Sequence, residues 1–261
     1  MKIFLSSLEN TAADKSIYPV NNLSSMLIER GIKMKWNLMS YYYLQNKDAI
    51  ANQIRDYSEQ ILIDSGAHSF QFGIKTDFKE YTIKYAEFIK RFDRPNVLGY
   101  FEMDIENIIG MDNVLELRKY LEGATDKIIP VWHKGRGIDN YLAMCEQYAG
   151  KVIAIGGFRG TDIRDDQYLM FLKYARQYGC KVHCLGMTRK QVLDKVPFDY
   201  TDSASWHMHS IYGSSYKKVK GKKFARPKNL AERNEQEIYN YQHGIALQEH
   251  YYQKWRKVCK D

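Results

Sequence analysis

Several short apolar runs in this sequence end in polar residues of kinds that carry out chemistry. These residues are Asp64 and Ser65 after the run at 60–66, Asp104 after 96–104, His133 after 127–133, Gly156 and Gly157 after 151–157, and Asp202 after 198–203. One aspartate after an apolar run commonly caps a helix or a turn. Several carboxylates brought to one place repel each other and lose hydration, which indicates a ligand or a reaction.

Paired carboxylates are suited to chemistry at a glycosidic bond. One carboxylate can attack an anomeric carbon and hold the sugar as an ester-like intermediate. A second carboxyl group with a raised pKa can give a proton to the departing group and later retrieve it. A further ionised aspartate can accept N–H donors from a base, and glycine permits close approach of the backbone.

The elements that must position these residues follow a regular rhythm. Eight β-rich apolar runs, at 2–7, 34–40, 60–66, 96–104, 127–133, 151–157, 181–187 and 198–203, alternate with stretches whose apolar residues recur every three or four positions. Alternating strands and helices predict a parallel sheet, and eight repeats predict a closed (β/α)₈ barrel. An open doubly wound sheet is the alternative, although no G-x-G-x-x-G follows the first run. In a barrel all strand ends named above meet at one face.

Composition narrows the class of protein. The chain has 261 residues and a net charge of +8, which favours an anionic partner such as nucleic acid. None of the four cysteines forms a C-x-x-C pair, so reduced thiols in a cytoplasmic protein are expected. The first residues are too soon polar for a signal peptide, and no run of about 18 apolar residues predicts a membrane span.

The region after the last predicted strand differs from the rest. We interpret the chain as an α/β protein, a single TIM-barrel domain over 1–261, with a basic arm at 207–228 and a long helix at 229–258 that is partly broken at Gly244. The arm lies beside the proposed site, and its basic side chains can hold phosphates. Our candidates for nucleic-acid binding are Lys217, Lys218, Lys220, Lys222, Lys223, Arg226 and Arg189.

The ordered set Asp64-Ser65-Gly66, Met103-Asp104, Ile155-Gly156-Gly157 and Asp199-Tyr200-Thr201-Asp202 resembles the tRNA-guanine transglycosylases, over roughly residues 60 to 206. That family exchanges guanine in a nucleic acid for a 7-deazaguanine through a covalent glycosyl-enzyme. The resemblance implies that Asp202 is the nucleophile and Asp64 the general acid/base. It also implies that Asp104, Gly156 and Gly157, with Ser65, contact the base. His133 stands near a position where the family usually has a glutamine.

The resemblance favours DNA as the partner. The tRNA enzymes carry a zinc subdomain after the barrel, and this shorter chain lacks its cysteine pattern, so it is more similar to the compact phage-type 7-deazaguanine DNA transglycosylases. We therefore expect DNA and a free 7-deazaguanine base as substrates, with no cofactor, no metal and no membrane. The target base must leave the helix to enter a barrel. Exchange on tRNA, a non-catalytic nucleic-acid-binding barrel and a nucleoside deoxyribosyltransferase are the alternatives.

Overall fold

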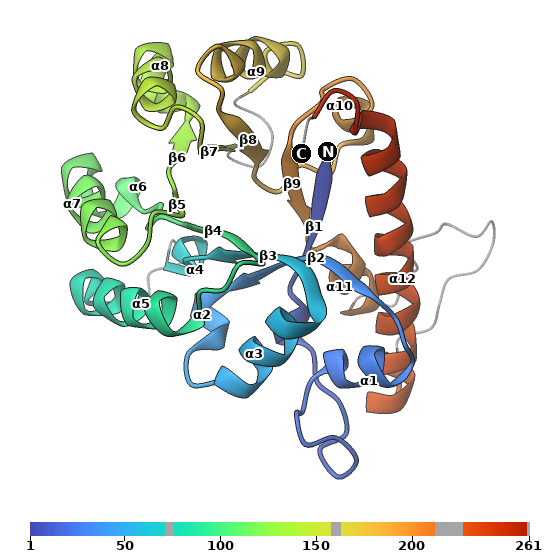
Figure 1. Ribbon diagram of the computed structural model, residues 1–261. Helices are drawn as coiled ribbons and strands as arrows, with labels where there is room; N and C mark the ends of the chain where they lie inside the picture. Colours follow the sequence, from blue (N-terminus) through green and yellow to red (C-terminus); the bar gives the residue numbers. More distant parts are fainter. Residues whose placement is uncertain (71–75, 158–162, 212–226, 260–261) are drawn as a thin grey trace.

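The strands form a parallel barrel in the computed structural model, which describes residues 1–70, 76–157, 163–211 and 227–259 (Figure 1). They are β1 (Lys2–Ser6), β2 (Met34–Ser40), β3 (Ser58–Asp64), β4 (Val97–Phe101), β5 (Ile128–Ile129), β6 (Val131–His133), β7 (Val152–Gly156), β8 (Lys181–Cys184) and β9 (Tyr200–Ser203). Their order in the sheet is β5-β4-β3-β2-β1-β9-β8-β7-β6, and all registers are parallel. The predicted fold class, a single-domain (β/α)₈ barrel, is confirmed.

The two edges of this sheet are consecutive in the chain. The predicted strand at 127–133 is divided at Pro130, so that β5 pairs with β4 and β6 pairs with β7. Proline has no N–H to give to a ladder, which explains the division. The carbonyl of Pro130 still accepts the N–H of Ala154 at 2.9 Å. The ring of strands therefore closes through this proline.

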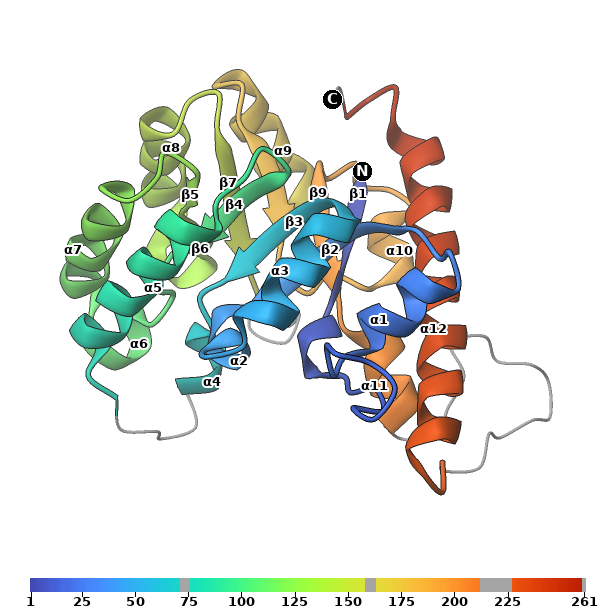
Figure 2. The same cartoon turned by 60° about the horizontal axis from the view of Figure 1, so that its bottom comes forward.

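Helices surround the barrel, as expected from the three- and four-residue spacing of apolar positions (Figures 1 and 2). The longer ones are α1 (Leu23–Glu29), α3 (Asp48–Tyr57), α5 (Phe78–Phe92), α7 (Met111–Glu122), α8 (Gly137–Gln147), α9 (Tyr168–Gln177), α11 (Ser205–Ile211) and α12 (Leu230–Trp255). The short ones are α2 (Tyr41–Leu44), α4 (Ala67–Phe70), α6 (Glu106–Ile109), α10 (Lys190–Leu193) and the 3₁₀ turns η1 (Leu8–Asn10) and η2 (Lys134–Arg136). Within the described residues, no helix combines the length and apolar character that a membrane span requires.

Apolar side chains fill the barrel and the layer around it. Phe4, Leu62, Phe101 and Ala154 belong to the cluster inside the barrel, while two larger clusters join the strands to the outer helices. Successive side chains along a strand pack alternately against the inner and the outer clusters, as expected for a sheet whose two faces are both buried. Because the interior is packed, a ligand can reach only the ends of the barrel.

The C-terminal helix lies along one side of the barrel, beside α1 and α11 (Figure 1). The predicted helix at 229–258 is present as α12, whose first turn is capped by the side chain of Asn229. The expected break at Gly244 is wrong, because α12 is continuous there. A Cβ at Gly244 would lie 2.8 Å from Cδ1 of Leu5, so the glycine lets the helix approach β1 closely.

The first residues of the predicted arm at 207–228 belong to a helix. Residues 205–211 form α11, and His207 is buried against Glu237 of α12 at 3.2 Å. A helix there is explained by Trp206, whose indole is fully buried and donates to the carbonyl of Ser6 at 2.8 Å. Arm residues 212–226 lie outside the described residues.

Candidate active site

The predicted polar residues lie at the C-terminal ends of their strands. Asp64 and Gly156 are the last residues of β3 and β7, and Asp202 is the third residue of β9. His133 ends β6, and Asp104 follows β4 by three residues. Parallel strands of a closed barrel all end at the same rim. The structure thus brings these five residues to one end of the barrel.

Asp202 is held by hydrogen-bond donors from three other segments. Its Oδ1 accepts the N–H of Gly186 at 2.8 Å, and its Oδ2 accepts the hydroxyl of Ser6 at 3.2 Å. Nε2 of His183 lies 3.0 Å from Oδ1. The Asp202 side chain is still 15% exposed. Donors on both oxygens fix the orientation of the Asp202 side chain, while its exposed part stays open to a reacting atom.

His183 is a site residue that the sequence reasoning missed. Its side chain is fully buried inside the barrel, 5.0 Å from the ring of Phe101 between centroids. Val182 and Cys184, its neighbours in β8, belong to the outer apolar cluster. The alternation of the run KVHC therefore contained the signal, because it places His183 on the inner face, opposite to Val182 and Cys184.

Asp64 has a different environment from Asp202. Its Oδ2 accepts the N–H of Gly66 at 3.0 Å, and the hydroxyl of Ser40 also bonds to it. Burial, together with the charges of Asp202 and Asp104, raises the pKa of Asp64 to about 6, although these hydrogen bonds lower it. Asp202 and Asp104 are thus near enough for their charges to act on Asp64. A carboxyl group of this kind can hold a proton near neutral pH.

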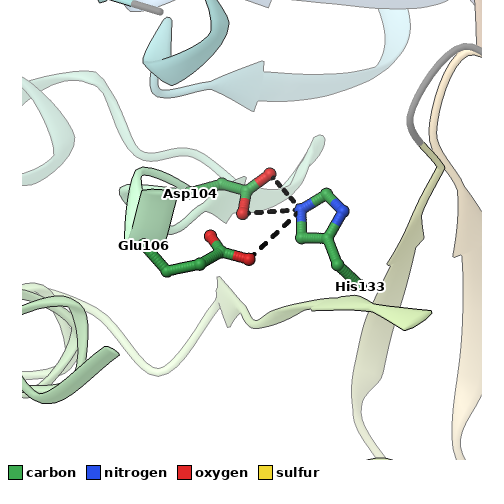
Figure 3. A group of neighbouring side chains, drawn as sticks. All are labelled: Asp104, Glu106 and His133. Atoms are coloured by element: carbon green, nitrogen blue, oxygen red, sulfur yellow. Dashed lines mark hydrogen bonds and ion pairs between the residues drawn. The ribbon is translucent and has the colours of Figure 1, made fainter. Parts of the chain in front are cut away.

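Asp104 lies in a network of four charged groups at the same rim. Both its oxygens are 2.8 Å from Nε2 of His133, and Glu106 Oε1 is 3.9 Å from that nitrogen (Figure 3). The guanidinium of Arg136 lies 2.9 Å from Glu106 and 3.6 Å from Asp104. Burial opposes ionisation of both Asp104 and His133. Their mutual contact outweighs it, so the pKa of Asp104 is lowered and that of His133 is raised.

This network is better suited to binding a polar ligand than a metal ion. Ligand atoms of Asp104, Glu106 and His133 all lie within 4.8 Å of one another, which is a spacing that a cation can use. The guanidinium of Arg136 occupies the same cluster, however, and its positive charge opposes a cation there. Glu106 and Arg136 were not identified from the sequence, since neither lies at the end of a predicted strand.

Gly156 lies directly against the ring of His133. The two residues are register partners in β7 and β6. A Cβ on Gly156 would lie 2.8 Å from Nδ1 of His133 and closer still to Cε1. The glycine is therefore required by the imidazole of His133, which covers it in this structure. Gly157, one residue further, is exposed.

Ser65 is placed differently from the other predicted base contacts. It is fully buried, and its hydroxyl donates to the backbone oxygen of Glu102 at 2.7 Å. The structure uses Ser65 to join the ends of β3 and β4 and does not present it at the rim. The carboxylate of Glu102 is likewise buried, in an ion pair with Arg118.

Two further residues named from the sequence, Asp199 and Arg189, can be located in the structure. Asp199 lies just before β9, where it accepts the N–H of Val182 at 2.8 Å, so its carboxylate is at the opposite end of the strand from Asp202. Arg189 precedes α10 and pairs with Asp165 at 2.6 Å, with a third of its side chain exposed. Lys217, Lys218, Lys220, Lys222, Lys223 and Arg226 lie outside the described residues.

Comparisons with known proteins add little to this geometry. No protein-family model matches the sequence, and no curated protein matches it. One solved structure, described as a novel GH10 endoxylanase retrieved from a sugarcane soil metagenome, is similar over 72% of this chain and 67% of its own, with 12% identity and a TM-score of 0.40. Similarity at that level carries no argument about function. The strand order and the rim residues define the class of protein, a TIM barrel with clustered carboxylates at the C-terminal ends of its strands.

Proposed function

We propose that this chain is a base-exchange enzyme of the tRNA-guanine transglycosylase type, which replaces guanine in DNA with a 7-deazaguanine derivative. The observation that carries the proposal is the contrast between two neighbouring carboxyl groups. Both oxygens of Asp202 accept hydrogen bonds from surrounding groups, whereas burial raises the pKa of Asp64 to about 6. Two carboxyl groups in such different environments are suited to separate roles as nucleophile and acid.

In the first half of the reaction, a carboxylate oxygen of Asp202 attacks C1′ of the target nucleotide. The bond from C1′ to the guanine nitrogen breaks, its electron pair stays on the base, and Asp64 gives that base its proton. In the second half, Asp64 takes a proton from the incoming 7-deazaguanine, whose ring nitrogen attacks C1′. The ester bond to Asp202 then breaks and its carboxylate is restored. Atoms and charges balance over the two halves.

The network around Asp104 offers the groups that a guanine-like base needs. An ionised Asp104 can accept the N–H donors of that base, and the protonated His133 can donate to its carbonyl oxygen. In this structure the two side chains contact each other at 2.8 Å. A base that binds between them would replace that contact with a matched set of hydrogen bonds. Because Gly156 has no side chain, it would leave room for the base at the bottom of this site.

The order of the residues along the chain supports the family assignment, and the charge supports a nucleic acid. Asp64, Asp104, Gly156 and Asp202 lie at or just after the ends of β3, β4, β7 and β9, and this order along the chain is the one that the resemblance implies. The net charge of +8 favours a polyanion over a free nucleoside. We favour DNA over tRNA because the sequence resembles the compact phage-type 7-deazaguanine DNA transglycosylases more than the tRNA enzymes.

The proposal is tested by supplying labelled guanine with either duplex DNA or tRNA. Label should enter DNA in the presence of the wild-type protein and should not enter it with Asp202→Ala. Entry into tRNA alone would move the substrate assignment to RNA. Entry into neither, with binding of DNA retained, would instead favour a non-catalytic nucleic-acid-binding barrel. Exchange with free deoxynucleosides alone would indicate a nucleoside deoxyribosyltransferase.

A further inference from the structure

A third buried carboxyl group, which the proposed reaction does not use, lies behind Asp64. Glu9 belongs to η1 directly after β1, and only 2% of it is exposed. Its Oε1 accepts the N–H of Ser40 at 3.0 Å, while Oε2 has no hydrogen-bond partner among the described residues. The charged groups that face it are Asp64 and Lys47. An ionised carboxylate buried with one oxygen unpaired is costly, which favours the protonated form.

Ser40 connects this group to Asp64. It is the last residue of β2 and the register partner of Asp64 at the end of β3. Its N–H bonds to Glu9, and its hydroxyl bonds to Asp64. One residue therefore contacts both carboxyl groups, so a change in the charge of either group is felt by the other. Asp202 and Asp104 are the other charged neighbours of Asp64.

The backbone is strained where it brings Glu9 into this position. Ser7 has a φ of 77°, in the left-handed region that residues other than glycine rarely adopt. The residue before it, Ser6, donates to Asp202. The short segment Ser6–Glu9 thus contacts Asp202 directly and Asp64 through Ser40. Strain of this kind persists where the surrounding structure enforces it, and such places are often functional.

We propose that Glu9 is a positioning residue that controls, through Ser40 and through its own charge, when Asp64 holds its proton. The inference takes from the proposed function only the role of Asp64 as acid and base. Burial raises the pKa of Glu9 to about 7, close to that of Asp64, so the two groups lose their protons over overlapping ranges of pH. Each ionised group then makes ionisation of its neighbour harder, and the pair titrates in two broad steps.

The inference is tested by titrating the side-chain carboxyl carbon of Asp64 by NMR in ¹³C-labelled protein without any substrate, with Asp64→Asn to assign the signal. In the wild type this signal should follow two steps. Glu9→Gln keeps the size of the side chain and an acceptor for the N–H of Ser40, but it cannot ionise. It should leave one step, displaced to lower pH by several tenths of a unit. Ser40→Ala removes the hydroxyl bond to Asp64 and should displace the step to higher pH.

A matched control removes a different buried carboxyl group. Glu237 is also fully buried, in α12, and Glu237→Gln should leave the Asp64 titration unchanged. Superimposable curves for wild type and Glu9→Gln would overturn the inference, and so would an equal displacement in Glu237→Gln. If Glu9→Gln does not fold, a single one-proton step in the wild type would also overturn it. Because no substrate is present, a displaced titration without base exchange would retain this inference and reject the proposed function.

Discussion

At the scale of single residues, the proposed base-reading role of Asp104 can be tested without disturbing the fold. Asp104→Asn places an N–H donor where the base already donates, which leaves polar groups unpaired at a cost of about 1–3 kcal/mol. We expect the free-base affinity to fall about 10- to 100-fold, with a smaller effect on thermal stability. Measurement of base binding by calorimetry checks this. Unchanged affinity would move the role to Glu106, since Glu102 is buried against Arg118.

The raised pKa of Asp64 predicts a pH dependence for the first half of the reaction. Departure of guanine needs Asp64 in its protonated form, and the protonated fraction falls as pH rises through about 6. The single-turnover rate of covalent adduct formation should therefore decrease from pH 5.5 to pH 8, roughly tenfold per unit at the upper end. Asp64→Asn is the control, and its residual rate should not vary with pH over this range. A wild-type rate that stays flat to pH 8 would reject Asp64 as the acid.

The three aspartates could be identified from the sequence, but the neighbouring groups that give them different environments could not. Asp64, Asp104 and Asp202 could be identified as candidates because each comes at the end of an apolar run. Ser6, Ser40 and Glu9 could not, because their contacts depend on strand register and on a strained turn at Ser7. Such contacts join segments far apart in the chain, and single-sequence periodicity does not report them.

At the scale of elements, the packing of β6 on β7 sets the position of His133. Gly156→Ala adds a Cβ that overlaps the imidazole, and His133 must move away from Asp104. We expect a loss of about 1–3 kcal/mol in stability and a fall in free-base affinity. Thermal unfolding and base binding, measured together, check both effects.

The matched control for that variant is Gly135→Ala in η2. A Cβ at Gly135 would meet nothing within 4 Å, although the residue lies only two positions after His133. Stability and base affinity should both be unchanged there. If Gly156→Ala behaves like Gly135→Ala, then the glycine is not required by the His133 ring and the described packing is incorrect.

Most strand positions followed from the apolar runs, and the departures have local causes. The run at 127–133 is one predicted strand, yet Pro130 removes a ladder donor and makes it two. Gly244 was expected to break the helix, but α12 is continuous there and packs closely on Leu5. Glycine is compatible with both outcomes, so only the neighbouring β1 decides between them.

At the scale of the whole molecule, the eight-fold rhythm predicted the closed barrel because eight strand-helix repeats leave few other parallel arrangements. The barrel in turn places the ends of β3, β7 and β9 at one rim. What the rhythm could not predict is how α12 attaches to it. Gln248 donates to the backbone oxygens of Ile3 and Trp36, at 2.8 Å each, which is a non-local contact between the C-terminal helix and the first two strands.

The net charge predicts a strong salt dependence of nucleic-acid binding, and the basic arm is expected to carry part of it. Replacing Lys217, Lys218, Lys220, Lys222 and Lys223 by glutamine should weaken binding of a fixed duplex. The slope of log affinity against log salt should become shallower by about 0.9 for each DNA phosphate that the variant no longer neutralises. Free-base affinity should not change. Binding is measured at several salt concentrations for both proteins.

A control of equal charge uses five exposed lysines away from the proposed rim, namely Lys33, Lys90, Lys151, Lys173 and Lys195. Their replacement by glutamine should change the slope less than the arm variant does. Equal slopes for the two variants would show that the arm contributes only to the overall charge. The nucleic acid would then have to be held by other groups at the rim, with Arg189 as the first candidate.

The central claim, that Asp202 forms a covalent bond to the sugar of the target nucleotide, is tested most directly by mapping the adduct. The protein is incubated with a guanine-containing DNA duplex, denatured by acid and digested, and the modified peptide is identified by mass spectrometry. We predict a nucleotide attached at Asp202 in the wild type and none in Asp202→Asn, which should retain the wild-type fold. An adduct on another residue, or an adduct that persists in Asp202→Asn, would contradict the account.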